Sequence, residues 1–241
     1  MKRLRIVPVA FLVAALLASG LVPTAAPNRI VQAQSVGDPA DAMLADAAEK
    51  LLGYDTMKFD LIYEKGSTKL YTGIKMTKAS GELQRPNRLK ATVQTKIGFV
   101  KVNVKATVIG DKAEVRAVGI EEDYNLPSDL AHIIADPVLL LPDVVAAVVN
   151  PVITKVETVK KGRDKGKELT WITGTFDPNL IEDEAVRGYA QRIGERPVDI
   201  AIDENGLIVS VRIAGAFVSQ DSKDVVRRLD IYGFGDPVEI S

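Results

Sequence analysis

The segment FVKVNVKATV, residues 99–108, decides the fold class of this chain. Its apolar residues alternate with polar ones without a break from Val100 to Val108, which is the period of a β-strand with one apolar face. The segments 89–94 and 112–117 alternate in the same way, and glycine-containing turns at Gly98 and Gly110 separate the three. They therefore predict consecutive antiparallel strands, a β-meander.

The rest of the chain mixes further strands with three helical regions. Asp38-Pro39 predicts a helix that ends at Gly53, and two more helical stretches are expected within 128–149 and 177–193. Alternating segments lie near 58–64, 153–160, 168–175, 198–202, 207–213 and 224–232. About ten antiparallel strands with inserted helices predict an α+β fold, in which a curved half-barrel sheet carries helices on its concave face around an apolar cavity.

The stretch from Val138 to Val149 is apolar except for Pro142 and Asp143. A surface helix has a polar face, so a helix that is apolar all round is either buried in a solid core or faces a space that holds an apolar ligand. The run is too short, and its proline too disruptive, for a membrane span. The residues predicted to line the cavity are Leu89, Ala91, Val93, Val100, Val102, Val104, Leu139, Leu140, Val144, Val145, Val148, Trp171, Val209, Val211 and Ile213.

Residues 1–33 have the pattern of a signal peptide. Three basic residues precede the short apolar run Ile6–Leu17, and small residues suit cleavage after Ala26 or after Ala33, of which we favour Ala33. An uncleaved anchor is the alternative. Gly20 stands where a lipobox would need a cysteine, so no lipid anchor is expected, and residues 34–241 should form one soluble, extracytoplasmic domain.

Charge and cysteine content exclude several function classes. Residues 1–33 hold four basic and no acidic residues, which leaves 27 basic against 32 acidic residues in the remainder, a net charge of −5 that disfavours nucleic acid. The chain has no cysteine, which excludes disulfides, thiolate metal sites and cysteine nucleophiles. The core must therefore be stabilised by packing.

Residues that could perform chemistry are few. There is no Gly-x-Ser-x-Gly motif, and His132, the single histidine, lies in an apolar stretch where packing is its usual role. The acidic runs 121–123 and 182–184 lack the spacing of a calcium loop and suit a solvated surface. The basic turn 160–167 suits a soluble hairpin tip or a contact with anionic headgroups. We expect no catalytic residue, no cofactor and no metal.

The order of motifs resembles the mycobacterial LppX/LprG-type lipoprotein family, whose fold is similar to that of the carrier LolA. The resemblance rests on the early helix, on ASGELQRP at 79–86, on Ile109-Gly110-Asp111, on Asp136-Pro137 and on LDIYGFGDPVEI at 229–240. It implies a half-barrel whose cavity holds the acyl chains of glycolipids or lipoproteins. The missing lipobox cysteine is a departure that puts membrane tethering in doubt.

The sequence thus predicts a secreted or cell-envelope, non-catalytic, monomeric carrier or binding protein for lipids, glycolipids or acylated proteins, with transient contact to a membrane surface. The alternative is an envelope-stress or signalling module of the same fold that binds a regulatory protein. An enzyme would need His132 as its base, and no nucleophile motif accompanies it.

Overall fold

The computed structural model describes residues 38–71, 74–97, 99–117, 120–126, 131, 135–182, 184, 187, 194–216, 221–222 and 224–241. The predicted signal peptide lies outside these residues. His132 also lies outside them, as does much of the helix predicted within 177–193, where the structure describes the short 3-10 helix η2 (Pro178–Leu180) and a few isolated residues.

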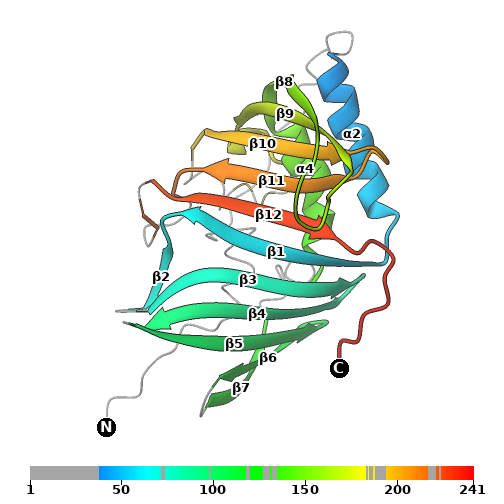
Figure 1. Cartoon of the computed structure of the whole chain (residues 1–241). Helices are drawn as coiled ribbons and strands as arrows, with labels where there is room; N and C mark the ends of the chain where they lie inside the picture. The colour runs from blue at the N-terminus through cyan, green and yellow to red at the C-terminus, as the bar shows by residue number, and fades with distance from the viewer. Residues whose placement is uncertain are drawn as a thin grey trace.

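One open, 12-stranded sheet forms the body of the molecule (Figure 1). Its strands are β1 (Thr56–Lys65), β2 (Thr68–Tyr71), β3 (Ile74–Gln84), β4 (Arg88–Ile97), β5 (Val100–Ile109), β6 (Lys112–Ala117), β7 (Ile120–Asn125), β8 (Val148–Thr158), β9 (Glu168–Phe176), β10 (Arg196–Asp203), β11 (Ile208–Ala214) and β12 (Val226–Tyr232). The order is β7-β6-β5-β4-β3-β1-β12-β11-β10-β9-β8, with β2 paired to β3. The predicted meander and the α+β half-barrel fold are confirmed.

Helix α2 (Pro39–Leu52) begins and ends where its sequence indicates. The Asp38 side chain accepts a hydrogen bond from the backbone N–H of Ala40 at 3.0 Å, and Gly53 follows the last turn. Its buried stripe includes Leu44 and Leu51 and packs against α4 (Leu141–Ala146), β8 and β11. Both helices therefore lie beside the β8–β12 half of the sheet (Figure 1).

The central apolar stretch is only partly helical, which corrects the prediction of a helix up to Val149. A 3-10 turn, η1 (Pro137–Leu140), leads into α4, which ends at Ala146, and Val148 already belongs to β8. Val148 pairs with Phe176 of β9, and the backbone N–H of Asp177 donates to the carbonyl of Ala147 at 2.7 Å. A β-branched residue beside a free strand edge favours sheet pairing over another helical turn.

A buried ion pair links three elements at one end of the sheet. Arg85, at the end of β3, donates from Nε to Asp136 Oδ2 at 2.7 Å and from Nη1 to the carbonyl of Leu52 at 2.5 Å. Asp136 is fully buried, and this burial raises the pKa of its carboxyl although Arg85 acts in the opposite direction. The pair holds the end of α2 and the start of η1 against the sheet.

Strand register separates an apolar face from a polar outer face. On the apolar face, the residues paired in order from β9 to β5 are Ile172, Ile200, Val211, Leu229, Leu61, Ala79, Val93 and Val104. One residue further along each strand, the paired residues are Thr173, Asp199, Arg212, Arg228, Ile62, Lys78, Gln94 and Asn103. Side chains alternate across a strand, so one face of the whole sheet is built to exclude water.

Candidate lipid-binding site

The strand ends that contain Val100, Ala214 and Val226 lie at the same end of the sheet, which we call the rim. The antiparallel register places them there. Val226, at the start of β12, pairs with Lys65 at the end of β1 and with Ala214 at the end of β11. Val100, at the start of β5, pairs with Ile97 at the end of β4. In Figure 1 the rim is the left-hand end of the sheet, opposite α2 and the C-terminus. The apolar face runs the whole way from α2 to the rim.

Burial on the apolar face decreases toward the rim. Along β5, Ala106 is 1% exposed, Val104 and Val102 are half-buried, and Val100 is 62% exposed. Along β11, Ile208 is buried, whereas Val211 and Ile213 are half-buried. Solvent therefore reaches apolar side chains in the rim half of the face. A ligand that covered them would remove apolar area from water, which is favourable in proportion to that area.

The predicted lining residues fall into groups by burial. Those buried in the main core are Leu89, Ala91, Val93, Val145 and Val148. Those that are half-buried on or beside the apolar face are Val102, Val104, Val144, Val211 and Ile213. Val100 and Leu139 are exposed, at 62% and 42%, and the side chain of Leu140 lies outside the described residues. Water-accessible apolar surface is thus concentrated in the second group and in Val100.

Trp171 and Val209, also predicted to line the cavity, lie in a separate small cluster with Leu169 and Ala201. Trp171 pairs with Ala201 on the outer face, one residue along from the apolar Ile172–Ile200 pair. Val209 reaches the same face because a register shift between β10 and β11 inserts it as an extra residue. A β-bulge of this kind reverses the alternation of side chains beyond it.

A charged cluster lies on the apolar face near the rim. Arg227 pairs in register with Tyr63 and Ile213, and its buried guanidinium forms an ion pair with the buried carboxylate of Asp221. Thr68 donates from Oγ1 to Asp221 Oδ1 at 2.6 Å and lies 2.6 Å from the Tyr63 hydroxyl. Burial raises the pKa of Tyr63, against the lowering effect of Arg227. The sequence did contain a signal for this buried arginine. Arg227 and Arg228 are consecutive in a strand and must face opposite sides of the sheet, so one of them has to lie on the apolar face.

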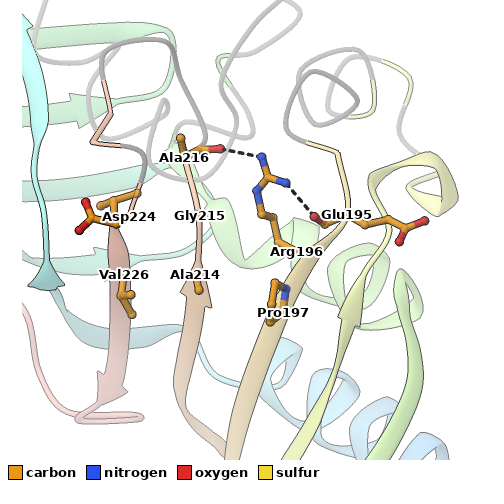
Figure 2. Close-up of a pocket in the computed structure, with 9 residues that line it drawn as sticks. Glu195, Arg196, Pro197, Ala214, Gly215, Ala216, Asp224 and Val226 are labelled. Carbon is orange, nitrogen blue, oxygen red and sulfur yellow. Dashed lines mark hydrogen bonds between the residues drawn. The ribbon is translucent and has the colours of Figure 1, made fainter.

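A pocket of about 600 Å³ opens at the rim ends of β10, β11 and β12 (Figure 2). Arg196 stands beside Gly215, and its guanidinium donates to the carbonyls of Glu195 at 2.8 Å and Ala216 at 3.3 Å. A side chain on Gly215 would collide with Arg196, since its Cβ would lie 2.6 Å from Arg196 Cδ. The pocket is within the usual size range of small-molecule sites, and its lining combines apolar residues with one cation, Arg196, and two acidic residues, Glu195 and Asp224.

The basic turn 160–167 is held against the outer face of the sheet. Arg163 donates to Asp60 Oδ2 at 2.8 Å, and its guanidinium lies 3.2 Å from the centre of the Tyr232 ring. Lys167 pairs with Asp164 at 2.9 Å. Two of the basic side chains of this turn are therefore engaged within the protein.

The described residues contain no group of three or more His, Cys, Asp or Glu side chains that could hold a metal ion. The acidic run 121–123 belongs to edge strand β7, where Glu121 pairs with Arg116 at 3.1 Å. Charged edge strands resist pairing with other sheets. Within the described part of the chain, no helix is both long and apolar enough to span a membrane.

Solved structures with this architecture exist although their sequences are distant. LprF from Mycobacterium bovis aligns with a TM-score of 0.57 at 18% identity, over 84% of this chain and 96% of LprF. The Mycobacterium tuberculosis lipoprotein LppX aligns with a TM-score of 0.56 at 19% identity, over 85% of this chain and 100% of LppX. A LolA superfamily protein from Nitrosomonas europaea aligns at 10% identity with a TM-score of 0.33.

No protein-family model matches the sequence, and no curated protein matches it. The two matches cover 84–85% of this chain and nearly the full length of each mycobacterial protein. This chain has the fold of LprF and LppX, which confirms at the level of the fold the resemblance to the LppX/LprG-type family that its motifs indicate.

Proposed function

We propose that this chain is an exported, non-catalytic carrier or binding protein for lipids, glycolipids or acylated proteins, and that it holds their acyl chains against the rim half of its apolar face. The observation that carries the proposal is the loss of burial toward the rim along β5, from 1% exposure at Ala106 to 62% at Val100, although every inward residue of that strand is apolar. The expected signal peptide supports a site of action outside the cytoplasm.

The energetics of such a site need no specific polar contact. Each methylene that leaves water contributes about 0.8 kcal/mol, so roughly ten methylenes of one acyl chain contribute about 8 kcal/mol. Ordering the chain and the side chains around it offsets part of this gain. Half-buried Val102, Val104, Val211 and Ile213 provide the apolar contact on the sheet.

The polar end of the ligand is expected at the rim, where it keeps access to water. The pocket beside Arg196 lies there, and its lining combines this guanidinium with apolar Pro197 and Val226 and with the acidic residues Glu195 and Asp224. A phosphate or carboxylate headgroup suits a guanidinium, because the two make charge-assisted hydrogen bonds.

A pair of neighbouring variants tests the site. Val102 and Asn103 are adjacent in β5 but face opposite sides of the sheet, so Val102→Arg places a charge among the acyl contacts and Asn103→Arg places the same charge on the outer face. In titrations with a fluorescent fatty acid, Val102→Arg should weaken binding at least about tenfold, and Asn103→Arg by less than about twofold. Equal effects from the two variants would refute the proposed site.

The second candidate function, a module that binds a regulatory protein, is favoured by one feature. Edge strand β8 exposes three apolar side chains, Val152, Ile153 and Val156, at 50%, 43% and 55%. An unpaired strand edge with apolar residues can add a strand from another protein. Measured binding of one defined partner that Val156→Lys abolishes, together with no lipid transfer between vesicles, would select this function over the carrier.

A further inference from the structure

Three lysines lie side by side on the outer face at the rim. Lys75 of β3 pairs in register with Lys96 of β4, which pairs with Lys101 of β5, and all three side chains are exposed. Lys69 of β2 occupies the next position in the same row. Like charges directly opposite each other across a strand pair are destabilising. The sheet therefore carries a local concentration of positive charge at a cost to its stability.

Several cations elsewhere on the outer face are paired with carboxylates. Lys78 pairs with Asp60 at 3.2 Å, Arg212 with Glu64 at 2.7 Å, and Arg228 with Asp230 at 2.9 Å. Among the described residues, no acidic group lies within ion-pair distance of the three rim lysines. Their charge is therefore free to attract an anion from outside the protein.

Exposed apolar side chains stand next to this row. Phe99, at the tip of the β4–β5 hairpin, is 99% exposed, and Val100 after it is 62% exposed. Val100 pairs with Ile97, and Ile97 with Ile74, so the end of the apolar face continues to the hairpin. Segments that lie in a membrane interface combine lysines on a polar face with aromatic and aliphatic side chains that enter the apolar layer, and the rim shows this combination.

We propose that the rim docks on an anionic lipid membrane, with Phe99 and Val100 entering the interface and Lys75, Lys96 and Lys101 on the headgroups. Charge complementarity selects this surface over a neutral one. The whole chain has a net charge of −1, so the attraction must come from the local row. The role of docking in lipid transfer rests on the proposed function, whereas the docking itself can be measured without it.

The test is co-sedimentation of the protein, purified after export of the full chain, with vesicles of equal parts phosphatidylglycerol and phosphatidylcholine. Each lysine near an anionic surface contributes about fivefold to the partition coefficient, so changing Lys75, Lys96 and Lys101 together to Gln should lower it about 100-fold. The control changes Lys90, Lys105 and Lys112 to Gln, which removes the same charge from the outer face away from the rim. The partition coefficient of the control variant should stay within about threefold of the wild-type value.

The single variant Phe99→Ser should also weaken vesicle binding, and it removes no charge and no core contact. Docking is overturned if the rim triple variant binds like the wild type, if the control loses as much, or if pure phosphatidylcholine vesicles bind equally well. Uptake of detergent-dispersed fatty acid separates the two proposals. A wild type that binds vesicles but takes up no fatty acid supports docking and refutes the carrier, and the reverse result overturns docking alone.

Discussion

Removal of the Arg85 side chain should destabilise the fold strongly, because it leaves the fully buried carboxylate of Asp136 without its cation. Breaking a buried ion pair from one side costs about 3–5 kcal/mol. The carbonyl of Leu52 also loses its donor, so we expect Arg85→Ala to lower the free energy of unfolding by about 4 kcal/mol. Urea denaturation followed by Trp171 fluorescence measures this difference. Arg88→Ala, which removes a part-buried hydrogen bond to the Ile240 carbonyl but leaves no buried charge unpaired, should cost about 1 kcal/mol.

The stability loss caused by Arg85→Ala should depend on pH, and its direction follows from the pKa of Asp136. Burial raises the pKa of Asp136 in the folded protein above its ordinary value of 3.8, and loss of Arg85 raises it further. A raised carboxyl pKa means that the folded state holds its proton more tightly, so stability from this group falls as pH rises above 3.8. The deficit of Arg85→Ala should therefore shrink on acidification from about pH 7 to about pH 4.5. A deficit below about 1 kcal/mol at neutral pH, or one that grows in acid, would refute the reasoning.

Two further predictions concern the sheet. Gly81→Ala should lower the free energy of unfolding by about 1–3 kcal/mol, because its Cβ would lie 2.4 Å from the Lys90 carbonyl oxygen and 2.6 Å from Phe59 Cζ. The neighbouring change Ser80→Ala should leave the free energy of unfolding nearly unchanged in the same denaturation assay. The folded state raises the pKa of Tyr63, so this group contributes stability below about pH 10 that is lost as the pH rises through its pKa in the folded protein. The free energy of unfolding should therefore decline less steeply in alkali for Tyr63→Phe than for the wild type. An equal decline in the two proteins would contradict this.

Local sequence signals predicted the elements whose causes are local. Asp38-Pro39 and Gly53 delimit α2 because a cap and a helix stop act within one turn. The unbroken alternation from Val100 to Val108 predicts β5 because all the apolar side chains of that strand lie on one face, which is buried at Ala106 and Val108. The glycine turn at Gly110, with φ of 62°, closes the next hairpin.

Features that depend on partners distant in sequence could not be read in this way. The helix ends at Ala146 because β9 offers a strand edge to Val148, whose partner Phe176 follows 28 residues later at the far end of the β8–β9 hairpin. Val209 faces outward because of a bulge relative to β10, which alternation alone does not reveal. The fall in burial along the apolar face depends on how the helices cover the sheet, so periodicity could predict the face but not which half of it solvent reaches.

Photo-crosslinking tests the central claim most directly. A fatty acid with a diazirine near its terminal methyl group would be bound to the wild-type protein, irradiated, and the adducts located by peptide mass spectrometry. Adducts on the strands at Val102, Val104, Val211 or Ile213, suppressed by excess unlabelled fatty acid, are the result predicted for chains held at the rim half of the apolar face. Adducts confined to outer-face positions such as Asn103 and Arg212, or adducts that excess fatty acid leaves unchanged, would contradict it.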